Sequence, residues 1–164
     1  MKSFGMGIGS QIQKIRRSDM KKKMTNLERR RIQMEYAVPL IRDLQRILGT
    51  DIVNDALARR SESSTSATGS KADFSRMQAA TENFAEGGAL DYEVIASDTD
   101  SFDMNVTRCG YAQMMEELEA RDIGHLLLCN LDFPAAEKVG MELKRSQTQM
   151  QGAPLCDFRY RRKS

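Results

Sequence analysis

The sequence predicts an α+β domain in which N-terminal helices precede a small antiparallel sheet with two inserted helices. Before residue 60, apolar residues recur at spacings of three and four, which is typical of amphipathic helices. Between residues 90 and 106 they alternate with polar residues, which is typical of strands. A second helical stretch separates these strands from another pair near the C-terminus. This order favours an antiparallel sheet packed on helices, and the 164 residues suit one domain, which we expect over 25–164.

The first helix is expected to begin after Thr25, because Thr25 and Glu28 form a capping-box pattern. Pro39 should kink this helix near Val38, and Gly49 should end it. The residues expected on its buried stripe are Met34, Ala37, Ile41, Leu44 and Leu48.

A shorter helix is predicted over residues 51–60, and the small polar residues of 61–71 after it indicate a loop. The residues that this helix should bury are Ile52, Val53, Ala56 and Leu57. A third helix is indicated by Phe74, Met77 and Phe84, and it should close at Gly87–Gly88.

Two strands of a hairpin follow, joined by a turn at residues 98–101, whose composition is DTDS. The alternating apolar residues are Leu90, Tyr92 and Val94 in the first strand, and Phe102, Met104 and Val106 in the second. Because side chains alternate across a strand, the second strand should turn its other residues to the opposite face. Those residues are Asp103, Asn105, Thr107 and Cys109.

The C-terminal third predicts two helices and two more strands. One helix should cover 110–120, and a second should cover 123–130, restart near Pro134 and end at Gly140. The strands are expected over 141–150 and 155–161, joined by a turn at 152–154.

Charge is distributed unevenly along the chain. Residues 1–31 carry ten Lys and Arg against two acidic residues, a net charge of +8, although the whole chain has only +2. We therefore interpret residues 1–24 as a basic, flexible arm. Interleaved aromatic residues and zinc-finger spacing are both missing, so nucleic-acid binding is not expected. No run of about 18 apolar residues predicts a membrane span, and no apolar region near the N-terminus predicts a secretory signal.

The three cysteines, Cys109, Cys129 and Cys156, are expected to be thiols in a reducing, cytoplasmic compartment. Their spacing matches no short metal motif, so on spacing alone they can be small buried hydrophobic residues. Cys109 precedes a predicted helix start, where backbone amides would stabilise a thiolate. Cys156 is followed by Asp157, whose charge would raise the pKa of a nearby thiol.

His125 lies four residues before Cys129 and seven before Asp132, so an unbroken helix would place all three on one face. Such a group would be either a Cys–His pair with a carboxylate or a set of metal ligands. The alternative is an exposed histidine. Three arginines fall on predicted strands, where each either binds a carboxylate or is solvated on the open face of the sheet. They are Arg108, Arg145 and Arg159.

Four stretches of the C-terminal half carry a resemblance to a known family. They read NVTRC-x-YA-x-MMEELE from Asn105, IG-x-LLLCN-x-D from Ile123, L-x-R-x-QT-x-M-x-G from Leu143 and CDFRY from Cys156. Together they resemble the L-2-amino-thiazoline-4-carboxylic acid hydrolase family. The resemblance implies that all three cysteines lie in family motifs. It also implies roles for Thr107, Arg108, Asp132, Arg145, Thr148 and Asp157.

The reaction that the resemblance implies opens a cyclic amidine-type C–N bond of a thiazoline carboxylate and gives N-carbamoyl-cysteine. A cysteine thiolate would be the nucleophile, and Asp132 or Asp157 would transfer protons if burial raised its pKa. Arg108 or Arg145 would hold the carboxylate of this small-molecule substrate. The alternative is a non-catalytic module in which Cys109, Cys129 and Cys156 bind a metal ion or sense a small ligand or redox state.

Overall fold

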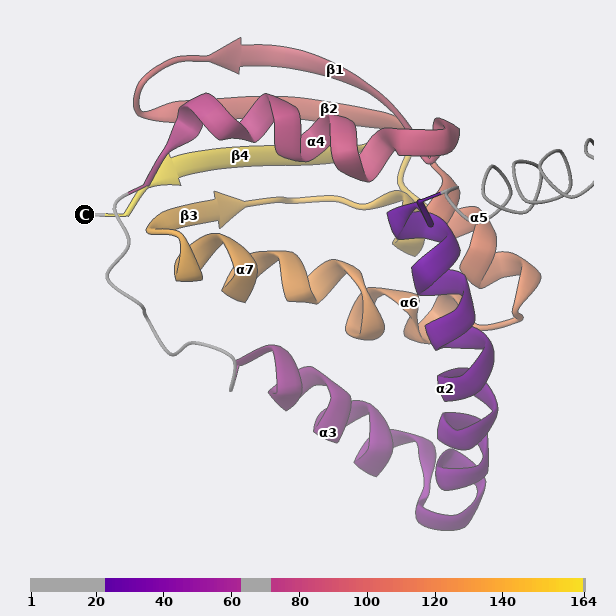
Figure 1. Ribbon diagram of the computed structural model, residues 1–164. Helices are drawn as coiled ribbons and strands as arrows, with labels where there is room; N and C mark the ends of the chain where they lie inside the picture. The colour runs from indigo at the N-terminus through magenta and orange to yellow at the C-terminus, as the bar shows by residue number, and fades with distance from the viewer. Residues whose placement is uncertain (1–22, 63–71, 164) are drawn as a thin grey trace, which may run out of the picture.

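The structure is a computed structural model of the chain, and it describes residues 23–62 and 72–163 (Figure 1). The predicted α+β architecture is confirmed, because the N-terminal helices are followed by a four-stranded antiparallel sheet with helices between its two hairpins. Residues 1–22 of the predicted arm and 63–71 of the predicted loop lie outside the described residues. Within the described ranges, no helix combines the length and apolar character that a membrane span requires.

The first described helix, α2, spans Asn26–Leu48 and begins with the predicted capping box. The Thr25 hydroxyl accepts a hydrogen bond from the amide of Glu28 at 3.1 Å, and the Glu28 carboxylate accepts one from the amide of Thr25 at 2.7 Å. The helix contains Pro39 and ends at Gly49, whose φ of 96° is typical of glycine.

The stripe that α2 buries differs from the predicted one. Its buried residues are Met34, Val38, Ile41 and Gln45. Ala37 is half-buried, whereas Leu44 and Leu48 are 38% and 52% exposed, so the prediction was wrong for these two leucines. The reason is that the face of α2 that contacts the core is rotated by about one residue from the predicted face. Gln45 is therefore buried at the position where Leu44 was expected.

Helix α3 spans Thr50–Glu62, so residues 61 and 62 of the predicted loop belong to this helix. Val53 is buried and Leu57 is half-buried, but Ile52 and Ala56 are exposed, contrary to the prediction. A short turn of 3-10 helix, η1 (Phe74–Arg76), buries Phe74 and leads into α4 (Met77–Ala85). Phe84 of α4 is 47% exposed.

The sheet has the strand order β1-β2-β4-β3. Its strands are β1 (Leu90–Ser97), β2 (Ser101–Cys109), β3 (Met141–Lys144) and β4 (Cys156–Arg162). The predicted turn between β1 and β2 is present, and the Asp98 carboxylate accepts hydrogen bonds from the amides of Asp100 and Ser101 at 2.8 and 2.7 Å. The third strand is shorter than predicted, because the chain leaves it after Lys144 and forms a 3-10 turn, η4 (Gln149–Gln151).

Three helices and a 3-10 turn connect the two hairpins. They are α5 (Gly110–Glu117), α6 (Arg121–Leu127), η3 (Cys129–Leu131) and α7 (Asp132–Lys138). The helix predicted over 123–130 is interrupted at Leu128, where φ and ψ are −123° and −63°. Pro134 lies in the first turn of α7, as its missing amide favours.

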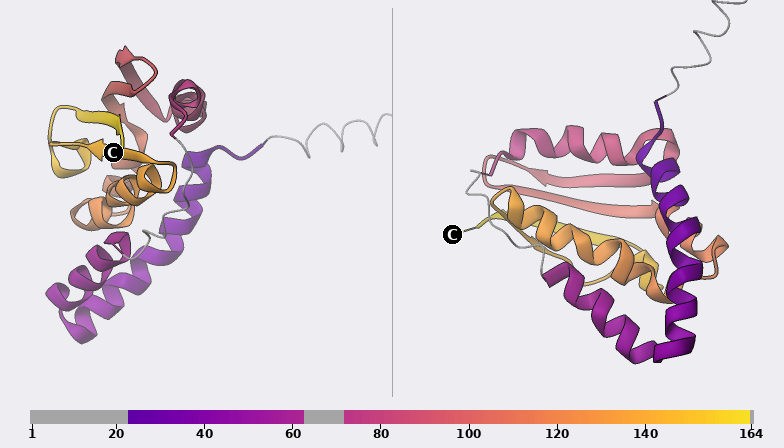
Figure 2. Two further views of the ribbon diagram at one scale, coloured as in Figure 1. Left: turned by 90° about the vertical axis from the view of Figure 1, so that its left-hand side faces the viewer. Right: turned by 60° about the horizontal axis from the view of Figure 1, so that its bottom comes forward.

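The core consists of two clusters of buried side chains. One lies among α2, α3, α5 and α6, and the other lies between the sheet and the segments that contain Phe74 and Ala136. Figures 1 and 2 show α4 and α7 beside the sheet, with α2 crossing one end of it. Cys109 packs against both clusters, at the point where they meet.

Candidate functional site

Cys109 ends β2 and immediately precedes α5. Its predicted position on the open face beside Thr107 was wrong. Pairing with β1 skips one residue between Arg108 and Val106, which makes a β-bulge at Thr107 and reverses the alternation after it. The thiol therefore faces the core.

The backbone amides of Tyr111 and Ala112, in the first turn of α5, make hydrogen bonds that lower the pKa of Cys109, but burial outweighs them and raises it. Arg108, which was expected to stabilise a Cys109 thiolate, has only a small effect, because its guanidinium binds Asp91. The predicted amide contacts are therefore present, whereas the predicted low pKa is not.

Cys129 and Cys156 come from two other elements. Cys129 begins η3, where burial and the charge of Asp132 raise the pKa of its thiol to about 12. Cys156 begins β4 and is buried, and its sulfur accepts a hydrogen bond from the amide of Gln149 at 3.2 Å. Burial raises the pKa of this thiol as well, and the amide of Gln149 opposes the increase.

Electrostatic interactions connect the three thiols with Asp132 and Arg145. Cys129 interacts electrostatically with both other cysteines, and Cys156 interacts with Cys109. The charges of Asp132 and Arg145 act on both Cys129 and Cys156, and Asp132 also acts on Cys109. We call these five residues the thiol–carboxyl cluster. The interruption at Leu128 separates Cys129 and Asp132 from α6, so these two residues do not continue the face of that helix.

An ion pair fixes the carboxyl group of the cluster. Arg145 donates hydrogen bonds to the Asp132 carboxylate at 2.7 Å and to the carbonyl of Cys129 at 2.9 Å. Its guanidinium carbon lies 5.0 Å from the ring centroids of both Phe133 and Phe158, and its side chain is only 3% exposed. These contacts occupy the guanidinium, so Arg145 orients Asp132 rather than presenting a free cation.

The Asp132 side chain has a raised pKa and is also partly exposed to solvent. Its side chain is 41% exposed, yet burial raises its pKa against the opposing effect of Arg145. A raised pKa and an accessible surface are the properties required of a general acid or base.

The other residues assigned roles by the resemblance, together with Arg159 of the last predicted strand, lie elsewhere and make structural contacts. Asp157 accepts hydrogen bonds from the amides of Ser146 and Gln147 at 3.0 and 2.9 Å, and although burial acts to raise its pKa, these bonds lower it. Thr148 caps η4, and Thr107 is exposed. Arg108 makes two hydrogen bonds to the Asp91 carboxylate, at 2.7 and 2.9 Å. Arg159 binds Asn105 and backbone carbonyls.

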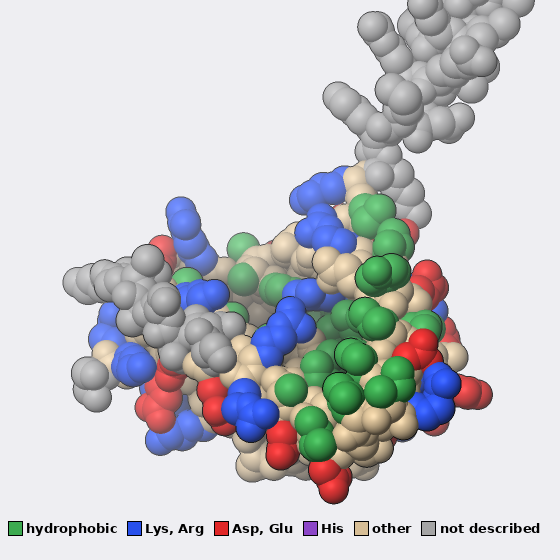
Figure 3. All heavy atoms as spheres, turned by 90° about the horizontal axis from the view of Figure 1, so that it is seen from below, with side chains coloured by type: hydrophobic (Ala, Val, Ile, Leu, Met, Phe, Trp, Pro, Cys, Tyr) green, Lys and Arg blue, Asp and Glu red, His purple; other side chains and the backbone are tan. Residues whose placement is uncertain are grey.

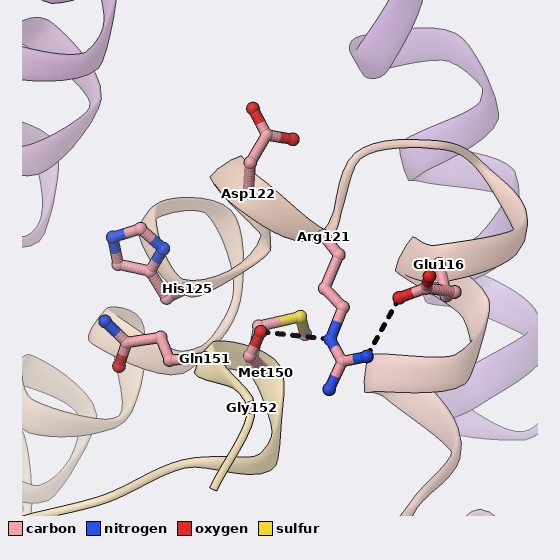
Figure 4. Close-up of a pocket in the computed structure, with 7 residues that line it drawn as sticks. All are labelled: Glu116, Arg121, Asp122, His125, Met150, Gln151 and Gly152. Carbon is pink, nitrogen blue, oxygen red and sulfur yellow. Dashed lines mark hydrogen bonds and ion pairs between the residues drawn. The ribbon is translucent and has the colours of Figure 1, made fainter.

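His125 lies apart from the cysteines. Because α6 ends before Cys129, the two side chains do not share a helix face. Figure 4 shows His125 at an open pocket of about 580 Å³, with Arg121 turned towards Glu116 and the carbonyl of Met150. The residues that line this pocket are Glu116, Arg121, Asp122, His125, Met150, Gln151 and Gly152.

Sequence reasoning missed Arg30, Tyr111 and Tyr160. Burial raises the pKa of Tyr111 to about 12, and the charges of Cys109, Arg30 and Asp132 also act on it. Burial likewise raises the pKa of Tyr160, which lies within reach of the charges of Asp132 and Arg145. Arg30 could have been found from the sequence, because it lies four residues before the buried Met34. This spacing puts a charged residue on the face of α2 that turns inward.

Metal binding by the cysteines is not favoured by this geometry. Among residues 23–62 and 72–163, no group of three or more His, Cys, Asp or Glu side chains is arranged to hold a metal ion.

The raised thiol pKa values predict slow alkylation of the native protein. Because the thiolate is the reactive form, each thiol should react with iodoacetamide at pH 7.5 more slowly than in the urea-denatured chain, and the rates should rise with pH. Cys129 should react most slowly. Cys109 and Cys156 should react faster than Cys129, because their sulfurs accept hydrogen bonds from backbone amides. Peptide mapping of timed samples measures each rate. A cysteine that reacts faster in the native protein would contradict the prediction.

The fold and the cluster together define a small α+β domain that carries an arginine-bound carboxyl group among three thiols. This chain belongs to the L-2-amino-thiazoline-4-carboxylic acid hydrolase family, whose model matches residues 25–160. A comparison with curated proteins finds no match. The predicted family is thereby confirmed, and it is named as a hydrolase.

Proposed function

We propose that this protein hydrolyses a small cyclic amidine that carries a carboxylate, such as L-2-amino-thiazoline-4-carboxylic acid, at the thiol–carboxyl cluster. The observation that carries the proposal is that the charge of Asp132, whose carboxyl group Arg145 orients, acts on the Cys109 thiol. A nucleophile with an oriented proton acceptor is what attack on an amidine carbon requires.

The product determines which ring bond breaks. In N-carbamoyl-cysteine the ring nitrogen stays on the carbonyl carbon, so its formation breaks the ring carbon–sulfur bond and releases a free thiol. Breaking the ring C–N bond would instead give S-carbamoyl-cysteine, which has a free amine and no thiol. We propose carbon–sulfur cleavage, which replaces the C–N cleavage expected from the sequence, because sulfur leaves as a weakly basic thiol.

Asp132 accepts the proton of Cys109 while the sulfur attacks the carbon between the ring nitrogen and sulfur. The ring carbon–sulfur bond breaks, its electron pair goes to the ring sulfur, and Asp132 returns the proton to that sulfur. Water then attacks the same carbon and gives a proton to Asp132, and the Cys109 sulfur leaves and is reprotonated. One water molecule is consumed. Burial makes Asp132 a stronger base than an ordinary carboxylate, which favours the first transfer.

We propose Arg30 as the group that binds the substrate carboxylate. Its hydrogen bond to Gln33, at 2.9 Å, leaves other donors of the guanidinium available, and its charge reaches both Asp132 and Tyr111. Arg108 and Arg145 suit this role less well, because carboxylates of the protein already bind both guanidinium groups.

Replacing Arg30 should therefore affect substrate binding more than turnover. A charge-assisted hydrogen bond contributes about 1.5–3 kcal/mol, so Arg30→Gln should raise KM roughly tenfold to hundredfold while kcat changes only a few-fold. The matched control is Arg31→Gln, because Arg31 binds Glu117 at 2.6 Å on another side of the helix. Steady-state kinetics measure both constants. An unchanged KM in Arg30→Gln would exclude Arg30 from substrate binding.

The alternative of a non-catalytic metal or redox module is supported less well. Redox-sensing cysteines need accessible thiols with a low pKa, whereas burial raises the pKa of all three thiols in the cluster.

The proposed function is tested by incubating the full chain with L-2-amino-thiazoline-4-carboxylic acid. We expect one free thiol for each substrate molecule consumed, with the mass and NMR spectrum of N-carbamoyl-cysteine. A product with a new amine and no thiol would overturn carbon–sulfur cleavage. No consumption of the substrate by folded protein would overturn the proposed activity.

A further inference from the structure

The outer face of α2 carries a band of exposed hydrophobic side chains. The band comprises Ile32, Tyr36, Leu40, Leu44 and Ile47, which are between 38% and 80% exposed. Figure 3 shows hydrophobic side chains gathered along this side of the molecule, beside a hollow. A helix in a monomer normally turns such a stripe towards its own core, but α2 already buries Met34 and Val38 on a different face.

The central part of this band is arranged symmetrically about Tyr36. Ile32 and Leu40 lie four residues before and after it, and Arg29 and Asp43 lie seven residues before and after it. These spacings place all five residues on one helix face. Ile32 and Leu40 match each other across Tyr36, whereas the two charged positions are opposite in sign. Leu44 and Ile47 extend the band towards the end of α2, and the polar residues Glu28 and Thr25 stand at the corresponding positions before Tyr36.

We propose that this face binds a second copy of the chain, with the two α2 helices packed antiparallel about a twofold axis at Tyr36. In a twofold interface each contact occurs twice, with the two residues exchanged between the copies. Tyr36 then meets Tyr36, Ile32 meets Leu40, and Arg29 meets Asp43. The opposite charges become complementary only in this antiparallel register, because a parallel pair would place each residue beside its own kind.

The surroundings of the band fit this arrangement. Asp43 is 60% exposed and already pairs with Arg46 of its own helix, so its carboxylate is oriented at the surface. Tyr36 is 80% exposed, and large aromatic side chains of this kind often lie at the centre of an interface. Ile52 of α3, which is 62% exposed, adds apolar surface beyond the end of α2.

The first test is the mass of the full chain in solution, measured by sedimentation at several concentrations. We expect a dimer at tens of micromolar that Tyr36→Glu and Leu40→Glu convert into a monomer. The matched control is Phe84→Glu in α4, which replaces an exposed hydrophobic residue outside the band and should leave the dimer intact. Circular dichroism should show that the variants remain folded.

The second test exchanges the charges at Arg29 and Asp43 and shows whether the two helices pack in the proposed antiparallel register. Arg29→Glu and Asp43→Arg each place like charges together at two positions of the dimer, so each should raise the dissociation constant roughly tenfold. The double variant restores opposite charges and should return the constant to within a few-fold of the original. A monomeric parent chain, a dimer insensitive to Tyr36→Glu, or a double variant no better than the single ones would each overturn the proposal.

Discussion

Cys109→Ser is expected to lower kcat by at least about 10³-fold, because removing a nucleophile eliminates the covalent route and leaves only uncatalysed attack by water. Serine nearly preserves the size of the side chain and can still receive the amide hydrogen bonds at the start of α5. The variant should therefore fold like the parent, and a thermal melt checks this. Cys129→Ser is the matched control, since its thiol has a pKa of about 12 and should not be the nucleophile.

Turnover within tenfold of the parent in Cys109→Ser would exclude Cys109 as the nucleophile. In that case Asp132 would act on water directly. An equally large loss in Cys129→Ser would show that the three thiols act as a unit rather than through Cys109.

Asp132→Asn is expected to lower kcat by about 10²–10⁴-fold, the usual range for a general acid–base group. Asparagine can keep a hydrogen bond to Arg145 but cannot accept the proton of Cys109. Asp157→Asn is the matched control, because the Asp157 carboxylate holds the amides of Ser146 and Gln147 and should affect stability more than turnover. Steady-state kinetics and thermal melts separate the two effects.

The raised pKa of Asp132 also predicts how activity and stability depend on pH. As a base Asp132 must be ionised, so activity should fall as the pH drops through a value above the ordinary aspartate range near 3.8. Burial disfavours the ionised form in the folded state, so the contribution of this group to stability is greatest at low pH and is lost as the pH rises through the raised pKa. The parent should accordingly lose stability relative to Asp132→Asn over that interval. A difference in stability that does not change with pH would contradict the raised pKa.

Much of the fold could be predicted because its signals are local. The capping box at Thr25 and Glu28, the alternation of Phe102, Met104 and Val106 in β2 and the turn at Asp98 each depend on residues only a few positions apart. Leu44 and Leu48 could not be assigned correctly, since both faces of α2 carry apolar residues and only tertiary packing decides which is buried.

The site was less predictable because two irregularities determine it. The bulge at Thr107 turns Cys109 inward, and the interruption at Leu128 places Cys129 and Asp132 outside α6. Neither follows from periodicity, which assumes a regular element. The resemblance identified Asp132 and Arg145, but their pairing, which turns Arg145 from a possible substrate ligand into a group that orients Asp132, is a long-range contact that appears only in the folded chain.

Our central claim is that Cys109 carries the substrate carbon during hydrolysis, and the mass of the enzyme during a single turnover tests it most directly. Full-length protein is mixed with less than one equivalent of L-2-amino-thiazoline-4-carboxylic acid, quenched in acid at successive times and digested for peptide mapping. We predict a transient increase equal to the mass of the whole substrate on the peptide that contains Cys109, because ring opening adds the substrate without losing an atom. An adduct on Cys129 or Cys156 instead, or product formed at the full rate after Cys109 has been alkylated, would contradict the account.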